Sequence, residues 1–118
     1  MSYFTGFLLA VPSDRKDAYA RQAAAFWEVF RDHGALSCAE NWGVDVPDGK
    51  VTSFPMAVKK AEDETVVFSW IEWADKAAAD AGWAGAMQDK RFVDLDGAQM
   101  LFDGKRMMWG GFETVFRA

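Results

Sequence analysis

The sequence predicts an α+β fold of the ferredoxin-like type, with the order βαββαβ and a four-stranded antiparallel sheet. Three observations lead to this prediction. Four segments are rich in β-branched and aromatic residues, which favours strands. Two longer segments between them have apolar residues at helical spacing. The length of 118 residues suits one domain, so we expect residues 1–118 to form a single unit.

The first strand and the first helix have clear boundaries. Residues 3–11 are nearly all apolar or small and a proline follows, so we expect a strand that is covered on both faces. Ser13 or Asp14 can cap the next helix, and Gly34 can end it after about His33. One stripe of this helix recurs at three- and four-residue steps, namely Tyr19, Ala23, Phe26, Phe30 and His33.

The middle of the chain predicts two further strands. We expect the second strand over residues 35–46, where the run VPDGK at 46–50 signals a turn, because proline presets φ and glycine accepts a positive φ. Residues 51–54 are expected to pair back as a short hairpin arm, and 56–61 to form a helical turn. The run TVVFSWIEW at 65–73 predicts the third strand.

The last third of the chain predicts one helix and one strand. We expect an Ala-rich helix over residues 75–89, with the aspartate at its start as the N-cap. Gly82 and Gly85 either weaken this helix or allow another backbone to approach closely. A loop or a short helical turn is expected over 91–98, and the last strand over 107–116.

The predicted strands carry apolar residues on both faces. In the third strand, one face has Val66, Phe68 and Trp70 and the other has Val67, Ile71 and Trp73. Two helices can cover only one face of such a sheet, and the other face would be a large exposed apolar patch. We therefore predict a two-fold homodimer that packs sheet against sheet.

Long blocks of the chain resemble the YbaA-like family of uncharacterised bacterial proteins, a domain of unknown function. The blocks are GFLLAVP at 6–12, FRDHGAL at 30–36, GKVTSFPMAVK at 49–59, DETVVFSWI at 63–71 and FDGKRMMWGGFE at 102–113. The resemblance implies membership of the dimeric α/β barrel superfamily. That superfamily includes cofactor-free monooxygenases, lactone isomerases, haem proteins and stress proteins without known activity. The resemblance implies a fold, and it supplies no catalytic residues.

Composition and charge argue against several classes of function. The net charge of −5 and the pI near 4.7 disfavour binding to nucleic acid or to an anionic membrane, because both need a basic face. Cys38 is the only cysteine, so no intrachain disulfide forms and a cytoplasmic location is expected. The apolar N-terminal run lacks a basic leader and is too short to cross a bilayer.

The single histidine, His33, has two interpretations. Its protonated form suits a helix C-terminus, which would be a structural role. Alternatively, it is a general base or a metal ligand at the mouth of a cleft between helix and sheet. Cys38 and Glu40 could approach the same metal, but their spacing matches no dense ligand motif. We expect no metal and no cofactor, with Cys38 acting as a small buried hydrophobe.

Three carboxylates lie within otherwise apolar strands: Glu40, Glu72 and Glu113. Such a group is costly unless it is paired or protonated. In one interpretation each lies near a strand end and reaches water or an arginine. In the other, a carboxylate with a raised pKa lies in a ligand cavity. Glu40 and Glu72 could lie close together, because the second and third strands are neighbours in this fold.

The segment LFDGKRMMWGGFE at 101–113 also allows two interpretations. Asp103-Gly104 is a common turn dipeptide, whereas Gly110-Gly111 falls inside the predicted last strand. In one interpretation, the two glycines mark a bulge or make room for a bulky side chain of a dimer partner. Alternatively they form the floor of a ligand pocket between Trp109 and Phe112.

Two functions remain open at this point, besides a dimer whose aromatic residues only pack. The first is binding of a small molecule in an aromatic pocket between sheet and helices, with cations at the rim that favour an anionic group. The second is a cofactor-independent monooxygenase or isomerase that acts on an aromatic or conjugated substrate, with His33 or Glu40 as the acid–base group. The expected ligand-binding residues are Trp42, Phe54, Trp70, Lys105, Arg106 and Trp109.

Overall fold

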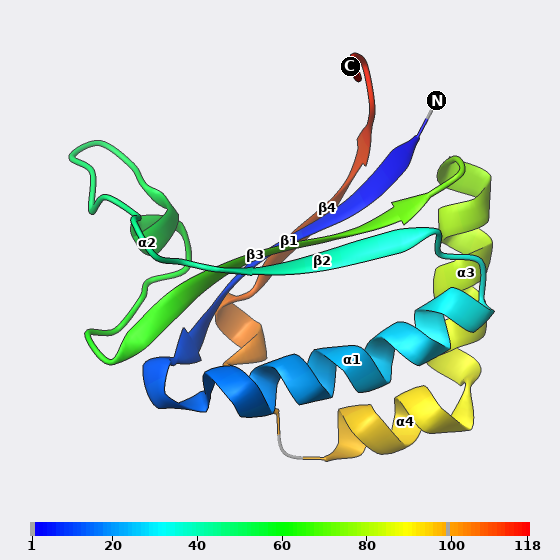
Figure 1. The fold of residues 1–118 in the computed structure, drawn as a ribbon, viewed down its shortest axis with the longest axis horizontal. Helices are drawn as coiled ribbons and strands as arrows, with labels where there is room; N and C mark the ends of the chain where they lie inside the picture. Colours follow the sequence, from blue (N-terminus) through cyan, green and yellow to red (C-terminus); the bar gives the residue numbers. More distant parts are fainter. Residues whose placement is uncertain (1, 99) are drawn as a thin grey trace.

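The computed structural model describes residues 2–98 and 100–118 of the chain. Figure 1 shows one twisted sheet with helices packed mainly on one side of it. The elements are, in chain order, β1 (Tyr3–Pro12), the 3-10 helix η1 (Ser13–Arg15), α1 (Lys16–Asp32), β2 (Ser37–Trp42), α2 (Phe54–Ala57), β3 (Glu64–Trp73), α3 (Lys76–Gln88), α4 (Lys90–Gly97), the 3-10 helix η2 (Gly104–Arg106) and β4 (Met108–Glu113).

The four strands form one antiparallel sheet in the order β2-β3-β1-β4. β1 lies between β3 and β4 and pairs with β3 along its whole length, from Tyr3 opposite Trp73 to Pro12 opposite Glu64. Outside β3 comes β2, where Glu40 lies opposite Ser69. The predicted α+β fold with a four-stranded antiparallel sheet is therefore confirmed.

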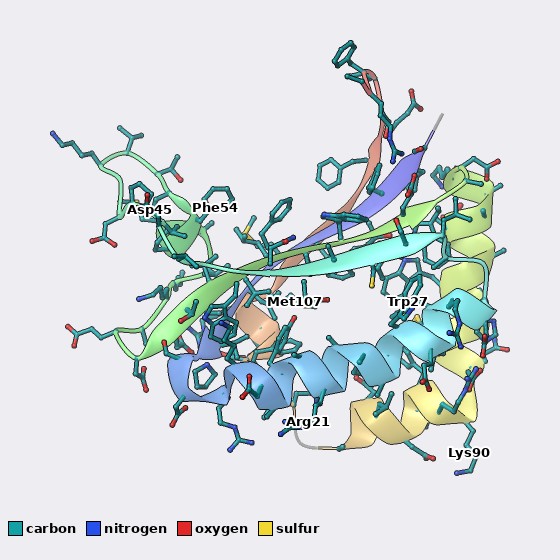
Figure 2. All side chains as sticks on the ribbon, viewed as in Figure 1. Arg21, Trp27, Asp45, Phe54, Lys90 and Met107 are labelled. Atoms are coloured by element: carbon teal, nitrogen blue, oxygen red, sulfur yellow. The ribbon has the colours of Figure 1, made fainter. Side chains whose placement is uncertain are left out.

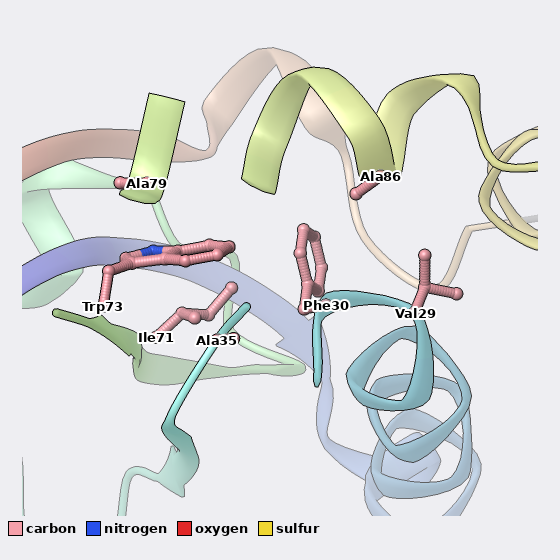
Figure 3. Packing of buried hydrophobic residues seen from close by; sticks show 7 residues of the cluster. All are labelled: Val29, Phe30, Ala35, Ile71, Trp73, Ala79 and Ala86. Atoms are coloured by element: carbon pink, nitrogen blue, oxygen red, sulfur yellow. The ribbon is translucent and has the colours of Figure 1, made fainter. Parts of the chain in front are cut away.

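The helices α1 and α3 cover one face of the sheet, and α4 packs against both of them (Figure 1). The core beneath α3 is built around Trp73, whose side chain is fully buried. Its ring meets Phe30 edge to face, and its indole N–H donates to the Thr5 hydroxyl at 3.1 Å. Figure 3 shows the Trp73 and Phe30 rings beneath α3. Gly82 has no side chain, so α3 can approach this ring closely, which was one of the two predicted roles for it.

Two predicted helix boundaries are confirmed. The Asp75 carboxylate accepts a hydrogen bond from the Ala78 N–H at 2.8 Å and thereby caps α3. Gly34 follows α1 with a φ of 103°, a conformation that glycine adopts without strain. The predicted caps of α1 were wrong, because no side chain caps its start and the Ser13 hydroxyl instead contacts that of Thr65.

The second strand is shorter than predicted, and the hairpin arm over 51–54 is absent from the described structure. β2 ends at Trp42, and the only element between it and β3 is the short helix α2. The chain instead folds back over the end of the sheet on the side away from α1. There Val58 is fully buried against Ala10 and Val66. Burial of these apolar groups explains why a turn and a packed loop replace the predicted strand extension.

Three differences concern the last third of the chain. Residues 91–98 were predicted as a loop or a short helical turn, and the helical alternative is confirmed in the longer helix α4, which Asp89 caps by accepting a hydrogen bond from the Arg91 N–H at 2.9 Å. The Asp103-Gly104 dipeptide begins η2 rather than a hairpin turn. β4 ends at Glu113, because its partner strand β1 begins opposite it at Tyr3. No helix in the described part of the chain is both long and apolar enough to cross a membrane.

The face of the sheet away from α1 and α3 exposes apolar side chains. Phe68, Met108 and Phe112 are 50%, 48% and 61% exposed. The strands therefore carry apolar residues on both faces, as the sequence predicts. An exposed group of this kind is typical of a surface that another protein covers.

Candidate functional site

A cavity of about 310 Å³ lies between the helices and the covered face of the sheet. Strands β1, β2 and β3 form one wall, and α1, α3, α4 and the segment before β4 form the other. Figure 2 shows Trp27 of α1 and Met107 in this layer. The aromatic lining residues include Phe7, Phe26, Trp27, Phe30, Trp83 and Phe92.

Contacts between rings hold the aromatic wall in place. Phe30 and Trp83 lie with their ring centroids 4.7 Å apart, and Phe26 and Phe92 lie 5.4 Å apart, both edge to face. The Trp83 indole N–H donates to the Thr5 hydroxyl at 3.1 Å, which fixes the ring against the sheet. Because α4 contributes Phe92, this helix closes one side of the cavity.

Tyr19 and Glu40 form the central polar pair of the cavity. Tyr19 comes from the stripe of α1 that faces the sheet, and Glu40 lies on β2 with its side chain on the same side. The Tyr19 hydroxyl donates a hydrogen bond of 2.6 Å to the Glu40 carboxylate. Ser69, opposite Glu40 in the next strand, also gives it a side-chain hydrogen bond. The pairing of β2 with β3 therefore places this carboxylate between two hydroxyl groups.

Burial controls the protonation of this pair. The surrounding protein raises the pKa of Glu40 above the usual value, and the hydrogen bonds from Tyr19 and Ser69 only partly oppose this. Burial and the nearby Glu40 carboxylate raise the pKa of Tyr19, so the phenol keeps its proton. Glu40 is nevertheless exposed to solvent, which limits the effect of burial on its pKa. A carboxylate in this state can accept a proton from a bound ligand.

Cys38 lies two residues before Glu40 and also lines the cavity. Burial and the Glu40 charge both raise the pKa of its thiol. The neutral thiol is a poor nucleophile, so Cys38 contributes a small, weakly polar surface to the wall.

His33 does not line the cavity. Its Nε2 lies 2.9 Å from Asp89, at the junction of α3 and α4, and its ring packs over Gly85. Arg91 and His33 hydrogen bonds hold the pKa of Asp89 well below its usual range. This geometry matches the structural interpretation of His33, since it ties the end of α1 to the start of α4. No group of three or more His, Cys, Asp or Glu side chains in the described residues is arranged to hold a metal ion.

The structure does not bring the four predicted aromatic ligand residues into this cavity. Trp42 packs beside Tyr19, with ring centroids 6.5 Å apart, and so supports the polar pair from outside. Trp70 meets Phe4 on the other face of the sheet. Phe54 lies on α2, on the far side of the sheet from α1 (Figure 2). Trp109 is 69% exposed on the edge strand β4.

The two predicted rim cations also lie elsewhere. Lys105 is exposed, and neither it nor Arg106 is among the lining residues. Arg106 binds both carboxylate oxygens of Glu64 at 2.7 Å and the Lys59 carbonyl at 2.9 Å. This pairing holds the pKa of Glu64 at about 2. These two cations therefore do not give the cavity the predicted preference for an anionic ligand.

The glycine pair of β4 is neither a bulge nor a pocket floor. Gly110 and Gly111 continue the regular pairing with β1. The Tyr3 phenol occupies the space above Gly111, and the Phe112 ring lies against Gly110 on the other face. The space left by the two glycines is thus filled by side chains of the same chain.

Glu40 and Glu72 lie on opposite faces of the sheet, because Glu40 pairs with Ser69, which is three positions from Glu72 on β3. Glu72 is bound by Arg117, Ser2 and Ser37, and these contacts lower its pKa. Glu72 therefore follows the interpretation in which the carboxylate lies near a strand end and reaches an arginine. Glu40, with its raised pKa in a cavity, follows the other interpretation.

Sequence reasoning did not single out Tyr19, Trp27 or Trp83 as site residues. Tyr19 lies on the predicted apolar stripe of α1, which was the available signal. The partner that gives it a polar role comes from a strand that is 21 residues away in the sequence.

Comparisons with known proteins identify the family. The family model described as "Protein of unknown function (DUF1428)" matches residues 2–104. The uncharacterised protein YbaA of Escherichia coli strain K12 and that of Shigella flexneri are each 52% identical over 115 residues, covering 98% of this chain and 97% of the relative. The chain therefore belongs to the DUF1428 family, and the YbaA-like resemblance is confirmed.

Solved structures share the fold at low identity. A putative antibiotic biosynthesis monooxygenase from Nitrosomonas europaea has a TM-score of 0.61 at 10% identity, covering 98% of this chain and 91% of that one. A dimeric ferredoxin-like protein from an uncultured marine organism has a TM-score of 0.57 at 16% identity, with both chains fully covered. SnoaB, a cofactor-independent oxygenase from Streptomyces nogalater, has a TM-score of 0.55 at 16% identity, covering 98% and 95%. These similarities establish a ferredoxin-like fold and leave the function of this chain open.

Proposed function

We propose that the protein binds a small aromatic or conjugated molecule in the cavity between its helices and sheet, and that it does so as a homodimer. The observation that carries the proposal is an aromatic cavity built around one hydrogen-bonded polar pair, Tyr19 and Glu40. Its volume of about 310 Å³ lies at the small end of the range for ligand pockets. Flat rings can stack on the walls, while the polar pair fixes the orientation of the ligand.

Filling the cavity tests the binding proposal. Ala23 lines the cavity, whereas the adjacent Ala24 is exposed on the same helix. The neutral fluorescent probe N-phenyl-1-naphthylamine should bind the protein, and Ala23→Phe should weaken its binding at least about tenfold. The matched variant Ala24→Phe should bind the probe as the natural protein does. Equal affinities for the two variants, or no binding of the probe at all, would count against the cavity as a ligand site.

The homodimer proposal rests on the exposed apolar face of the sheet. Phe68, Met108 and Phe112 lie on this face, on which neither α1 nor α3 packs. A second copy of the chain can cover the same surface by two-fold symmetry. The likeness to a dimeric ferredoxin-like protein supports this occupant over others.

Native mass spectrometry tests the dimer and its surface. We expect a dimer for the natural chain and a monomer for Phe68→Asp, because an unpaired carboxylate in an apolar interface is costly. Met87→Asp is the control, since Met87 is 58% exposed on α3, away from this face. A monomeric natural chain, or equal dissociation of both variants, would contradict the proposed surface.

A second candidate function is cofactor-independent catalysis, and the raised pKa of Glu40 favours it. The Glu40 carboxylate would remove a proton from a conjugated ligand. An isomerase would return this proton at another carbon. In a monooxygenase the resulting carbanion would be oxidised by dioxygen, with one oxygen atom entering the product and the other leaving as water.

Proton exchange distinguishes catalysis from binding alone. The probe is an aromatic ketone with an acidic methylene group, and the measurements are its deuterium uptake by NMR and the consumption of dioxygen. An isomerase or a monooxygenase should accelerate the deuterium uptake, and a monooxygenase should also consume dioxygen. Glu40→Gln should abolish the acceleration and retain the affinity for the ketone. His33→Gln should leave the rate unchanged, because His33 lies outside the cavity. Binding without exchange would exclude this role for Glu40 and leave the binding proposal intact.

A further inference from the structure

The charged residues that line the cavity all have the same sign. Glu40 and Asp96 are both carboxylic acids, and the described lining residues include no lysine, arginine or histidine. The sequence had indicated the opposite, a rim of cations. The sign of the charge on the walls decides which ligands can enter without an electrostatic penalty.

No nearby cation neutralises Glu40. The ion pairs among the described residues do not involve it, and Tyr19 and Ser69 give it hydrogen bonds from uncharged hydroxyl groups. Arg21 is the basic residue of α1 nearest to Tyr19 in sequence, and its side chain is exposed on the outer side of the helix (Figure 2). A hydroxyl donor orients a carboxylate but does not cancel its charge, so the site keeps a negative potential whenever Glu40 is ionised.

The walls add a second feature that attracts cations. Seven of the lining residues are tryptophan or phenylalanine, namely Phe7, Phe26, Trp27, Phe30, Trp83, Phe92 and Phe102. The faces of such rings are electron-rich and attract ammonium groups, most strongly where water is excluded. The same rings accept the flat, apolar part of a ligand. Carboxylate and rings together therefore match a molecule with an aromatic body and a positively charged nitrogen.

We infer that the cavity selects an aromatic amine in its ammonium form, with the ammonium group against the Glu40 carboxylate and the aromatic body between the helices and the sheet. This inference rests on the proposed binding function and names the chemical class of its ligand. An anionic ligand of the same shape is disfavoured, because it would bring a further negative charge beside Glu40 and Asp96 without a cation on the cavity wall to pair with it.

Three ligands with one aromatic scaffold test the inference. They are 2-(2-naphthyl)ethylamine, 2-(2-naphthyl)ethanol and 2-naphthylacetate, which are cationic, neutral and anionic at pH 7. Isothermal titration calorimetry should show the amine binding at least about tenfold more tightly than the alcohol, and the carboxylate binding more weakly than the alcohol. The order of the three affinities depends on charge alone, since the ring system is shared.

Variants locate the charge that is responsible. Glu40→Gln should weaken binding of the amine at least about tenfold and change binding of the alcohol by less than about twofold, since the amide keeps the shape and loses the charge. Glu28→Gln is the matched control, because it removes the same charge from the exposed face of α1 and should leave both affinities unchanged.

Proton release provides a readout on the unmodified protein, in case Glu40→Gln does not fold. An ammonium group beside Glu40 favours the ionised carboxylate and lowers its pKa. Above pH 4.5, where the raised pKa keeps a part of Glu40 protonated, calorimetry in buffers of different ionisation enthalpy should therefore detect proton release with the amine and none with the alcohol.

The outcomes separate the inference from the function on which it rests. Preference for the amine, lost in Glu40→Gln, supports both. Binding of the alcohol or the carboxylate as tightly as the amine overturns the cationic ligand class and leaves the cavity as a binding site. Binding of none of the three overturns the proposed function, and with it the inference.

Discussion

Removing the Tyr19 hydroxyl is the most direct test of the polar pair. Tyr19→Phe deletes the donor of the 2.6 Å hydrogen bond to Glu40 and leaves the ring in place. That ring is buried and packs against Trp42 and Phe102, with centroid distances of 6.5 and 6.4 Å. The substitution therefore changes one hydrogen bond with little change in packing.

The expected loss of stability follows from the partners of the bond. A hydrogen bond to a charged group contributes about 1.5–3 kcal/mol. Glu40 is exposed to solvent, and Ser69 still binds it, so we expect the lower part of this range. A loss of about 1–2 kcal/mol corresponds to a melting temperature lower by roughly 4–8 °C for a domain of this size.

The pH dependence of this loss has a definite sign. The folded pKa of Glu40 lies above its reference value of 4.5, so the folded protein holds this proton more tightly than the unfolded chain. Stability contributed by this group is therefore lost as pH rises from about 4.5 through the folded pKa. The Tyr19 hydrogen bond lowers that pKa, so Tyr19→Phe raises it further and enlarges the loss. The difference between variant and natural protein should be largest near neutral pH and smallest below pH 4.5.

The assay is a double-mutant cycle at two pH values. Urea unfolding of the natural protein, Tyr19→Phe, Glu40→Gln and the double variant gives the coupling energy between the two side chains. We expect a coupling of about 1–2 kcal/mol at pH 7.5 and clearly less at pH 4, where the carboxyl group is protonated. A coupling of zero at pH 7.5, or the same coupling at both pH values, would refute the charged hydrogen bond.

Two further predictions concern the scaffold. Gly82→Ala should lower the melting temperature, because the new methyl group meets the buried Trp73 ring and costs about 1–3 kcal/mol, more than the ~1 kcal/mol that alanine gains in a helix. Gly97→Ala is the control and should be neutral or stabilising, since open space surrounds that position; equal losses in both would contradict the close packing. Arg106→Met should destabilise the protein at pH 7, because Arg106 holds the Glu64 pKa at about 2. The contribution of this ion pair to stability is present above pH 4.5 and is lost as pH falls through about 2. Thermal melts should therefore show that the difference in melting temperature between the natural protein and Arg106→Met shrinks in acid. A difference that does not depend on pH would count against the Arg106–Glu64 pair.

The fold could be predicted because its strands and main helices are encoded locally. The row of β-branched and aromatic residues in β3 and the apolar stripe of α1 need no long-range information. The boundaries at Gly34 and Asp75 follow from backbone conformation and from capping. The length of α4 could not be predicted in the same way, because the short segment KRFVDLDG also fitted a loop. Its place depends on Phe92 packing against Phe26 of a distant helix.

The site could be predicted only in part. A carboxylate in an otherwise apolar strand indicated Glu40, because a charge there is costly unless it is paired or protonated. The spacing of α1 placed Tyr19 on the face that meets the sheet. Their contact depends on how far α1 extends before the chain returns as β2, and local patterns do not fix that distance. His33 lies on the same stripe by spacing, but α1 ends at Asp32 and the histidine contacts Asp89 instead.

The reversed charge of the site has a geometric cause in η2. A 3-10 helix has three residues per turn, so side chains three positions apart point in the same direction. Gly104 and Met107 are three apart, and both line the cavity. Lys105 and Arg106 lie between them and do not line the cavity, and Arg106 instead reaches Glu64. The η2 turn removes both cations from the wall, which leaves Glu40 and Asp96 to set its charge and makes a cationic ligand the complementary one.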